Sequence, residues 1–104
     1  MSGFSLSPEA WGDLDEIHAC IAADNPSAAD QVLEAAFSTF SHLAQRPELG
    51  RLRRFSHSLL TDFRSFGVRG FTNYVIFYRS RAAQVEIVRV LHGAQDFDAI
   101  FGSD

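Results

Sequence analysis

The sequence predicts an α+β fold: a short N-terminal strand, a helical hairpin packed on a mainly antiparallel sheet of three to four strands, and a short C-terminal helix. The apolar runs Tyr74–Tyr78 and Val85–Leu91 are rich in Val, Ile, Phe and Tyr, which favour strands. Residues 7–46 instead space their apolar side chains as helices do. The length of 104 residues and the hydrophobic fraction of 46% are typical of one globular domain, which we expect to cover residues 1–104.

The N-terminal strand and the first helix come from residues 4–23. Phe4-Ser5-Leu6 alternates apolar and polar residues, as a short strand does, and Ser7-Pro8-Glu9 is a typical helix start. The helix then carries one apolar stripe made of Ala10, Leu14, Ile17 and Ile21. Four acidic residues fall mostly off this stripe, so we expect them on a solvated outer face: Asp13, Asp15, Glu16 and Asp24.

The second helix begins at Asn25-Pro26, where Asn25 is the predicted cap, and it ends at Pro47. Its apolar stripe consists of Ala29, Leu33, Ala36, Phe40 and Leu43. Because the connection between the two helices is only a few residues long, we expect them to lie antiparallel as a hairpin.

The second half of the chain holds the predicted sheet. Residues 48–60 are either a solvated connector or a basic loop that binds a partner. A strand is expected at 63–68, followed by a turn marked by Gly67, Gly70 and Asn73. The two central runs do not alternate cleanly, which indicates strands covered on both faces. Residues 94–101 are predicted to form the terminal helix.

Charge is distributed unevenly along the chain. Residues 1–50 contain eight acidic residues and one Arg, whereas residues 51–104 contain eight Arg and five acidic residues; the chain has no Lys and a net charge of −4. An arginine-rich second half points to an anionic partner for one face, and all-Arg usage is also compatible with codon bias.

Several classes of protein are excluded by what the sequence lacks. There is no CxxC, no HExxH and no Gly-rich phosphate loop, and the four His lie far apart, so we expect no metal and no cofactor. No apolar run is long enough for a membrane helix, and the N-terminus does not resemble a signal peptide. Cys20 stands alone, which favours a reducing, cytoplasmic setting, and we expect it to be a small buried hydrophobic residue.

The chemistry-bearing residues that remain are Arg, Tyr and His around the predicted sheet. They are Arg64, Arg69, Tyr74, Tyr78, Arg79, Arg81, Arg89 and His92. Such a set could process RNA without a metal, with Arg stabilising phosphate charge and His or Tyr moving a proton. It could equally be a binding face on which Arg forks grip carboxylates. For His92, at a strand end before Gly93, a structural hydrogen bond is the favoured interpretation.

The sequence resembles the ParE/RelE toxin superfamily, the toxin half of type II toxin–antitoxin modules, over nearly its whole length. The matching segments are LSPEA at 6–10, DLDEI at 13–17, DNPSAAD at 24–30, LAQRPELGR at 43–51, VIFYR at 75–79 and VEIVRVLHGAQD at 85–96. The last two are the most specific. The fold of this family is β–α–α–β–β–β, which agrees with the pattern derived above.

The resemblance is greater to the ParE branch, which implies a cytoplasmic toxin that poisons DNA gyrase and blocks replication and growth. Its implied partner is a ParD-like antitoxin whose disordered C-terminal part folds on the toxin. Neither direct nucleic-acid binding nor membrane association is expected. The alternative is the RelE branch, which cuts mRNA on the ribosome, or a non-toxic relic that only binds its antitoxin. A net acidic chain without Lys is poorly suited to docking on ribosomal RNA.

Two sets of candidate site residues follow. We expect the target to meet a basic surface made of Arg53, Arg54, Arg64, Arg69, Arg79, Arg81 and Arg89. If the RelE alternative holds, the nuclease-like residues are Tyr78 and His92. We expect the antitoxin to cover apolar surface on the helical hairpin and to reach the sheet.

Overall fold

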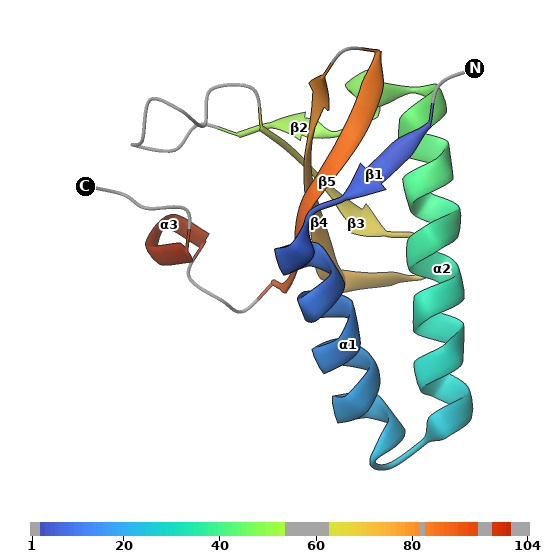
Figure 1. Ribbon diagram of the computed structural model, residues 1–104. Helices are drawn as coiled ribbons and strands as arrows, with labels where there is room; N and C mark the ends of the chain where they lie inside the picture. The colour runs from blue at the N-terminus through green and yellow to red at the C-terminus, as the bar shows by residue number, and fades with distance from the viewer. Residues whose placement is uncertain (1–2, 54–62, 82, 94–96, 101–104) are drawn as a thin grey trace.

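The structure is a computed structural model that describes residues 3–53, 63–81, 83–93 and 97–100. Along the chain these residues form β1 (Phe4–Leu6), α1 (Pro8–Ala22), α2 (Pro26–Gln45), the 3₁₀ helix η1 (Pro47–Leu49), β2 (Arg51–Leu52), β3 (Arg64–Val68), β4 (Phe71–Arg81), β5 (Gln84–His92) and α3 (Phe97–Ile100) (Figure 1). The predicted α+β arrangement is confirmed, and β2 adds a short strand where the sequence indicated only an irregular stretch. Three parts of the predictions lie outside the described residues: Arg54, residues 55–60 of the predicted connector or basic loop, and residues 94–96 and 101 of the predicted terminal helix.

The described strands form one five-stranded sheet in the order β1-β5-β4-β3-β2. The strands β3, β4 and β5 make the predicted antiparallel meander, and β1 joins it parallel to β5. Gly70, at φ +87°, allows a tight turn after Val68, so β4 starts at Phe71 and Asn73 lies in the strand rather than in the turn. The turn is therefore shorter than predicted, and of the three residues expected to mark it only Gly70 lies in it, because Gly67 belongs to β3.

Both predicted helix starts are confirmed by side-chain caps. Ser7 Oγ accepts a hydrogen bond from the Ala10 N–H at 3.0 Å, and Asn25 Oδ1 accepts one from the Ala28 N–H at 3.1 Å. Each cap satisfies an N–H group that has no partner inside its own helix. The two helices run antiparallel on one face of the sheet (Figure 1), so the hairpin prediction is also confirmed.

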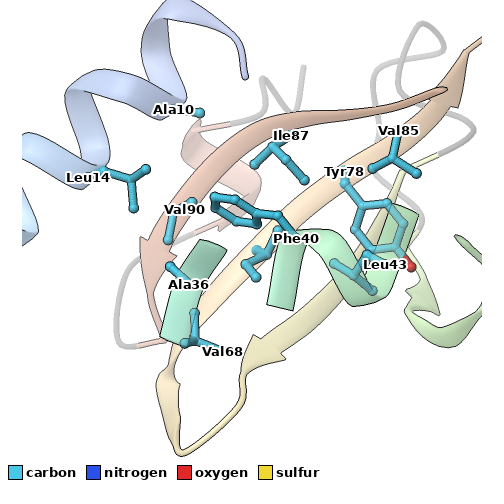
Figure 2. Close-up of a cluster of buried hydrophobic side chains, with 11 residues drawn as sticks. Ala10, Leu14, Ala36, Phe40, Leu43, Val68, Tyr78, Val85, Ile87 and Val90 are labelled. Carbon is cyan, nitrogen blue, oxygen red and sulfur yellow. The ribbon is translucent and has the colours of Figure 1, made fainter. Parts of the chain in front are cut away.

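The main core lies between the helical hairpin and the sheet. Figure 2 shows Phe40 and Leu43 of α2 facing Tyr78, Ile87 and Val90 of the central strands, and all five are almost fully buried. A second cluster covers the opposite face, hereafter the rear face. It is built from Phe63, Phe77 and Leu91, with Phe97 and Ile100 packed against it. The central strands are thus covered on both sides, as their consecutive apolar residues predicted.

Two expectations about α1 were wrong. Asp13 is not solvated, because its side chain is only 12% exposed and reaches β5. Cys20 is exposed rather than buried. The far end of the helical hairpin extends past the strands, so the sheet does not cover the whole length of α1 (Figure 1). Among the described helices, none is both long and apolar enough to cross a bilayer.

Candidate functional site

The predicted arginines do not form one surface, and two of them, Arg53 and Arg79, lie against aromatic rings on the rear face. The guanidinium of Arg53 lies 5.7 Å from the centroid of the Phe77 ring and 5.6 Å from that of Phe97. The guanidinium of Arg79 lies 5.6 Å from the centroid of Phe63 and donates to Glu86 at 2.8 Å. These cation–π contacts hold both side chains against the second apolar cluster.

Tyr78 and Arg64 instead join η1 to the sheet on its other side. The Tyr78 hydroxyl donates to the Pro47 carbonyl at 2.6 Å and accepts from the Gly50 N–H at 2.7 Å, while Arg64 Nη1 donates to the Gly50 carbonyl at 2.8 Å. Tyr78 is fully buried, and desolvation raises the pKa of its hydroxyl above the ordinary value. The hydroxyl therefore stays protonated, and both of its hydrogen bonds are made to backbone groups.

Arg89 is drawn to α1 by a two-pronged ion pair with Asp13. Its Nε lies 2.7 Å from Oδ2 and its Nη2 lies 2.9 Å from Oδ1, and Oδ2 also accepts the Val90 N–H at 3.0 Å. The hydrogen bond with Asp13 raises the pKa of Arg89, burial opposes the rise, and Glu9 and Glu16 add to it. Asp13 thus neutralises this guanidinium, and two further acids lie near it.

Arg69 and Arg81 are both exposed, and they lie near opposite ends of β4. Arg69 lies in the turn before β4 and donates its backbone N–H to Thr39 Oγ1 at 3.1 Å, whereas Arg81 is the last residue of the strand. An 11-residue strand spans roughly 35 Å at ~3.3 Å per residue. The two side chains therefore cannot contact the same small feature of a partner.

His92 lies at the other end of β5 from the β4–β5 turn and is exposed. Its ring meets that of Tyr74, the residue opposite it on β4, edge to face with centroids 5.5 Å apart. Tyr78 pairs with Ile87 instead, and at the usual rise per residue it lies about 13 Å along β4 from Tyr74. The two candidate nuclease residues, Tyr78 and His92, therefore do not lie together. The Tyr78 hydroxyl is buried, so it does not reach the surface on which His92 is exposed.

His92 borders a pocket of about 290 Å³ between α1 and the ends of the central strands, hereafter the α1 pocket. Its lining is Asp13, Glu16, Ile17, Cys20, Tyr74, Arg89, Val90, Leu91 and His92. Sequence reasoning missed Asp13 and Glu16 as functional candidates. The available signal was their spacing, because Asp13, Glu16, Ile17 and Cys20 follow i, i+3, i+4 and i+7, one face of a helix.

In the described part of the chain, no group of three or more His, Cys, Asp or Glu side chains is arranged to hold a metal ion. Every buried side-chain nitrogen or oxygen there also has a hydrogen-bond partner, so none is left pointing at an absent ligand.

Comparison with known proteins gives a consistent result. Residues 4–97 match the family model described as the ParE toxin of the type II toxin–antitoxin system, parDE. The chain is 34% identical over 95 residues to Toxin RelE3 of Caulobacter vibrioides, which covers 91% of this chain and 98% of that protein. A solved structure, the chromosomal ParDE TA system from P. aeruginosa, superposes with a TM-score of 0.69 at 18% identity, over 88% of this chain and 95% of the other.

This chain therefore belongs to the ParE toxin family of type II toxin–antitoxin systems. The membership confirms the resemblance to the ParE/RelE superfamily. The solved structure independently shows the same fold.

Proposed function

We propose that this protein is a cytoplasmic toxin that poisons DNA gyrase, blocks replication and is neutralised by a cognate antitoxin. The match of residues 4–97 to the ParE toxin family is the observation that carries the proposal. Damage to gyrase stops growth in cells that lose the antitoxin. On a plasmid, such a module would favour cells that keep the plasmid.

The geometry favours a gyrase-directed toxin over a nuclease. The Tyr78 hydroxyl is buried and hydrogen-bonded to backbone, and it lies far from His92 along the sheet. Arg89, which could otherwise stabilise phosphate charge, is paired with Asp13. The net charge of −4 also opposes docking on ribosomal RNA.

Target binding is assigned to the predicted arginines, with Arg69 and Arg81 as the leading members because both are exposed. Arg53 and Arg79 form a second group on the rear face. Arg64 and Arg89 should contribute less to target binding, because Arg64 hydrogen-bonds the Gly50 carbonyl and Arg89 is paired with Asp13. Arg54 stays a prediction, as it lies outside the described residues.

The proposed antitoxin is ParD-like, with a disordered C-terminal segment that folds on the toxin. The helical hairpin offers it an aromatic anchor: Trp11 on α1 is 51% exposed and its ring lies 5.9 Å from that of Phe37 on α2. Large aromatic side chains of this kind often dominate the binding energy of an interface.

A supercoiling assay tests the gyrase proposal. Purified protein should inhibit supercoiling by gyrase and trap cleaved DNA, and the cognate antitoxin should reverse both effects. Arg69→Gln and Arg81→Gln should each weaken inhibition several-fold. Arg46→Gln is the matched control, because Arg46 is also exposed but lies at the C-terminal end of α2. Unchanged supercoiling at a large excess of toxin would reject the proposal.

A RelE-type activity is the second candidate, and the RelE3 name of the Caulobacter relative favours it. Primer extension on translated mRNA would then show new cleavage sites after the toxin is expressed. A third outcome, harmless overexpression together with tight antitoxin binding, would identify a non-toxic member of the family.

A further inference from the structure

The α1 pocket has two chemically different walls. The helix wall presents Asp13, Glu16 and Ile17, and the strand wall presents Tyr74 and the other strand residues named above. At about 290 Å³ its volume is just below the ~300–1,000 Å³ typical of ligand pockets. Its size suits one side chain of a partner better than a cofactor.

The charge around this pocket is negative. Asp13 neutralises Arg89 through two hydrogen bonds, whereas Glu9 and Glu16 also act electrostatically on Arg89 and add negative charge. Glu16 is exposed and lines the pocket, so its carboxylate is accessible to a guest. A cation is favoured here, because an anion that approached Arg89 would also meet Glu16.

The strand wall adds an aromatic element. Tyr74 and His92 lie edge to face at an interplanar angle of 89°, and both border the pocket. A guanidinium is planar, stacks on aromatic rings and bonds carboxylates with two parallel N–H groups, whereas the Lys ammonium is a compact point charge. The combination of Glu16 with Tyr74 therefore favours Arg over Lys.

We propose that the α1 pocket receives an arginine side chain of the antitoxin, with Glu16 as its carboxylate partner and Tyr74 as its aromatic wall. The identity of the partner rests on the proposed function. The chemistry of the guest rests on the charge and shape of the pocket. The contact would add a polar anchor near the strand ends to the apolar one at Trp11.

Calorimetric titration of the toxin with its cognate antitoxin tests the proposal. Glu16→Gln should weaken binding about tenfold, equivalent to about 1.4 kcal/mol. Asp15→Asn is the matched control: it removes the same charge from the adjacent exposed position, which does not line the pocket, and should stay within about twofold. Equal effects of the two substitutions, or no effect of Glu16→Gln, would overturn the proposal.

A small probe examines the pocket without the antitoxin. N-acetyl-arginine amide should shift the amide resonances of Glu16, Tyr74 and His92 in a saturable way. N-acetyl-citrulline amide, its neutral analogue, should do so at least about fivefold more weakly, since it lacks the charge. Identical titrations with both probes, or shifts that survive Glu16→Gln unchanged, would show that no cation is recognised.

The two experiments separate failure of this proposal from failure of the proposed function. Tight antitoxin binding that is indifferent to Glu16→Gln leaves the toxin–antitoxin pairing intact and rejects the arginine contact. Absence of any antitoxin binding rejects the proposed partner, and with it the arginine contact as stated. Loss of gyrase inhibition alone affects neither titration.

Discussion

At the scale of single residues, the Tyr78 hydroxyl lies where η1 meets β4 and satisfies two backbone groups at once. Tyr78→Phe should leave the Gly50 N–H and the Pro47 carbonyl without this partner inside the protein. We expect a loss of about 1–3 kcal/mol in the free energy of unfolding, measured by chemical denaturation. Tyr74→Phe, on the same strand, should change it by much less. Equal stabilities of the two variants would contradict the assigned structural role of Tyr78.

The same hydroxyl predicts a dependence on alkaline pH. Burial raises the pKa of Tyr78 in the folded protein, so the folded state holds this proton more tightly than the unfolded state. Its stabilising contribution is complete below about pH 10, the ordinary Tyr value, and is lost as pH rises toward the raised pKa. Denaturation curves across this range should show the loss, and Tyr78→Phe should remove that part of the dependence. An identical decline in the variant would assign it to other groups.

Two glycines should respond in opposite directions to Ala. A Cβ on Gly50 would lie 2.8 Å from Tyr78 Cζ, closer than such atoms approach, so Gly50→Ala should cost about 1–3 kcal/mol. Gly12 lies within α1, and a methyl group added there would meet no atom within 4 Å beyond the neighbouring backbone of its own helix, so Gly12→Ala should stabilise by about 0.5–1 kcal/mol. Thermal denaturation distinguishes them, and destabilisation by both would show that the helix surface at Gly12 is not open.

At the scale of elements, α1 completes the hydrogen bonding of β5 beyond the short strand β1. The Ser7 N–H donates to Ile87, the Ser7 hydroxyl donates to Val88 at 2.7 Å, and Asp13 accepts from the Val90 N–H. The N-cap residue Ser7 and the helix residue Asp13 thus take the place of a longer neighbouring strand. This edge is covered along these residues and cannot recruit another strand there.

Asp13→Asn tests that arrangement. The substitution removes the charge that pairs with Arg89 and weakens the contact with Val90, so we expect a loss of about 1.5–3 kcal/mol in unfolding free energy. Asp15→Asn, at an exposed position on the same helix, should stay within about 0.5 kcal/mol. Chemical denaturation of both variants checks this, and similar values would mean that the ion pair contributes little.

Sequence reasoning found the elements with strong local signals and missed those set by contacts distant in the chain. The caps at Ser7 and Asn25 and the apolar central strands are local, and all were predicted. β2 is only Arg51–Leu52 and depends on pairing with Ser65 and Arg64, for which no local pattern exists. Asp13 looked like a surface acid because its partner Arg89 lies 76 residues away.

The arginine surface was harder to predict because a strand alternates its faces and this sheet changes register. Phe77 pairs with Arg89 and Tyr78 with Ile87, so Val88 is an extra residue in β5. Val88 packs on the rear cluster while Arg89 turns to α1. A sequence pattern does not reveal where such a shift occurs. Arginines that looked equivalent therefore lie in separate surroundings.

At the scale of the whole molecule, stability should be highest at the centre of the sheet. β4 and β5 are paired on both sides and buried on both faces, whereas β2 is two exposed residues at an edge. Amide hydrogen exchange should therefore be slowest in the middle of β4 and β5 and fast in β2. Exchange measured by NMR would contradict this if β2 amides were as protected as those of Ile76 and Phe77.

The parallel pairing of β1 with β5 also has a consequence for biosynthesis. Phe4 of β1 pairs with Val85 of β5. Because β1 is synthesised early and β5 late, β1 cannot pair until most of the chain has left the ribosome. Until then the emerging helices have no sheet on which to bury their apolar stripes. A nascent chain that stops before residue 84 lacks β5 altogether. Premature termination should therefore release a fragment without a complete core, which cellular proteases degrade before it can act as a toxin.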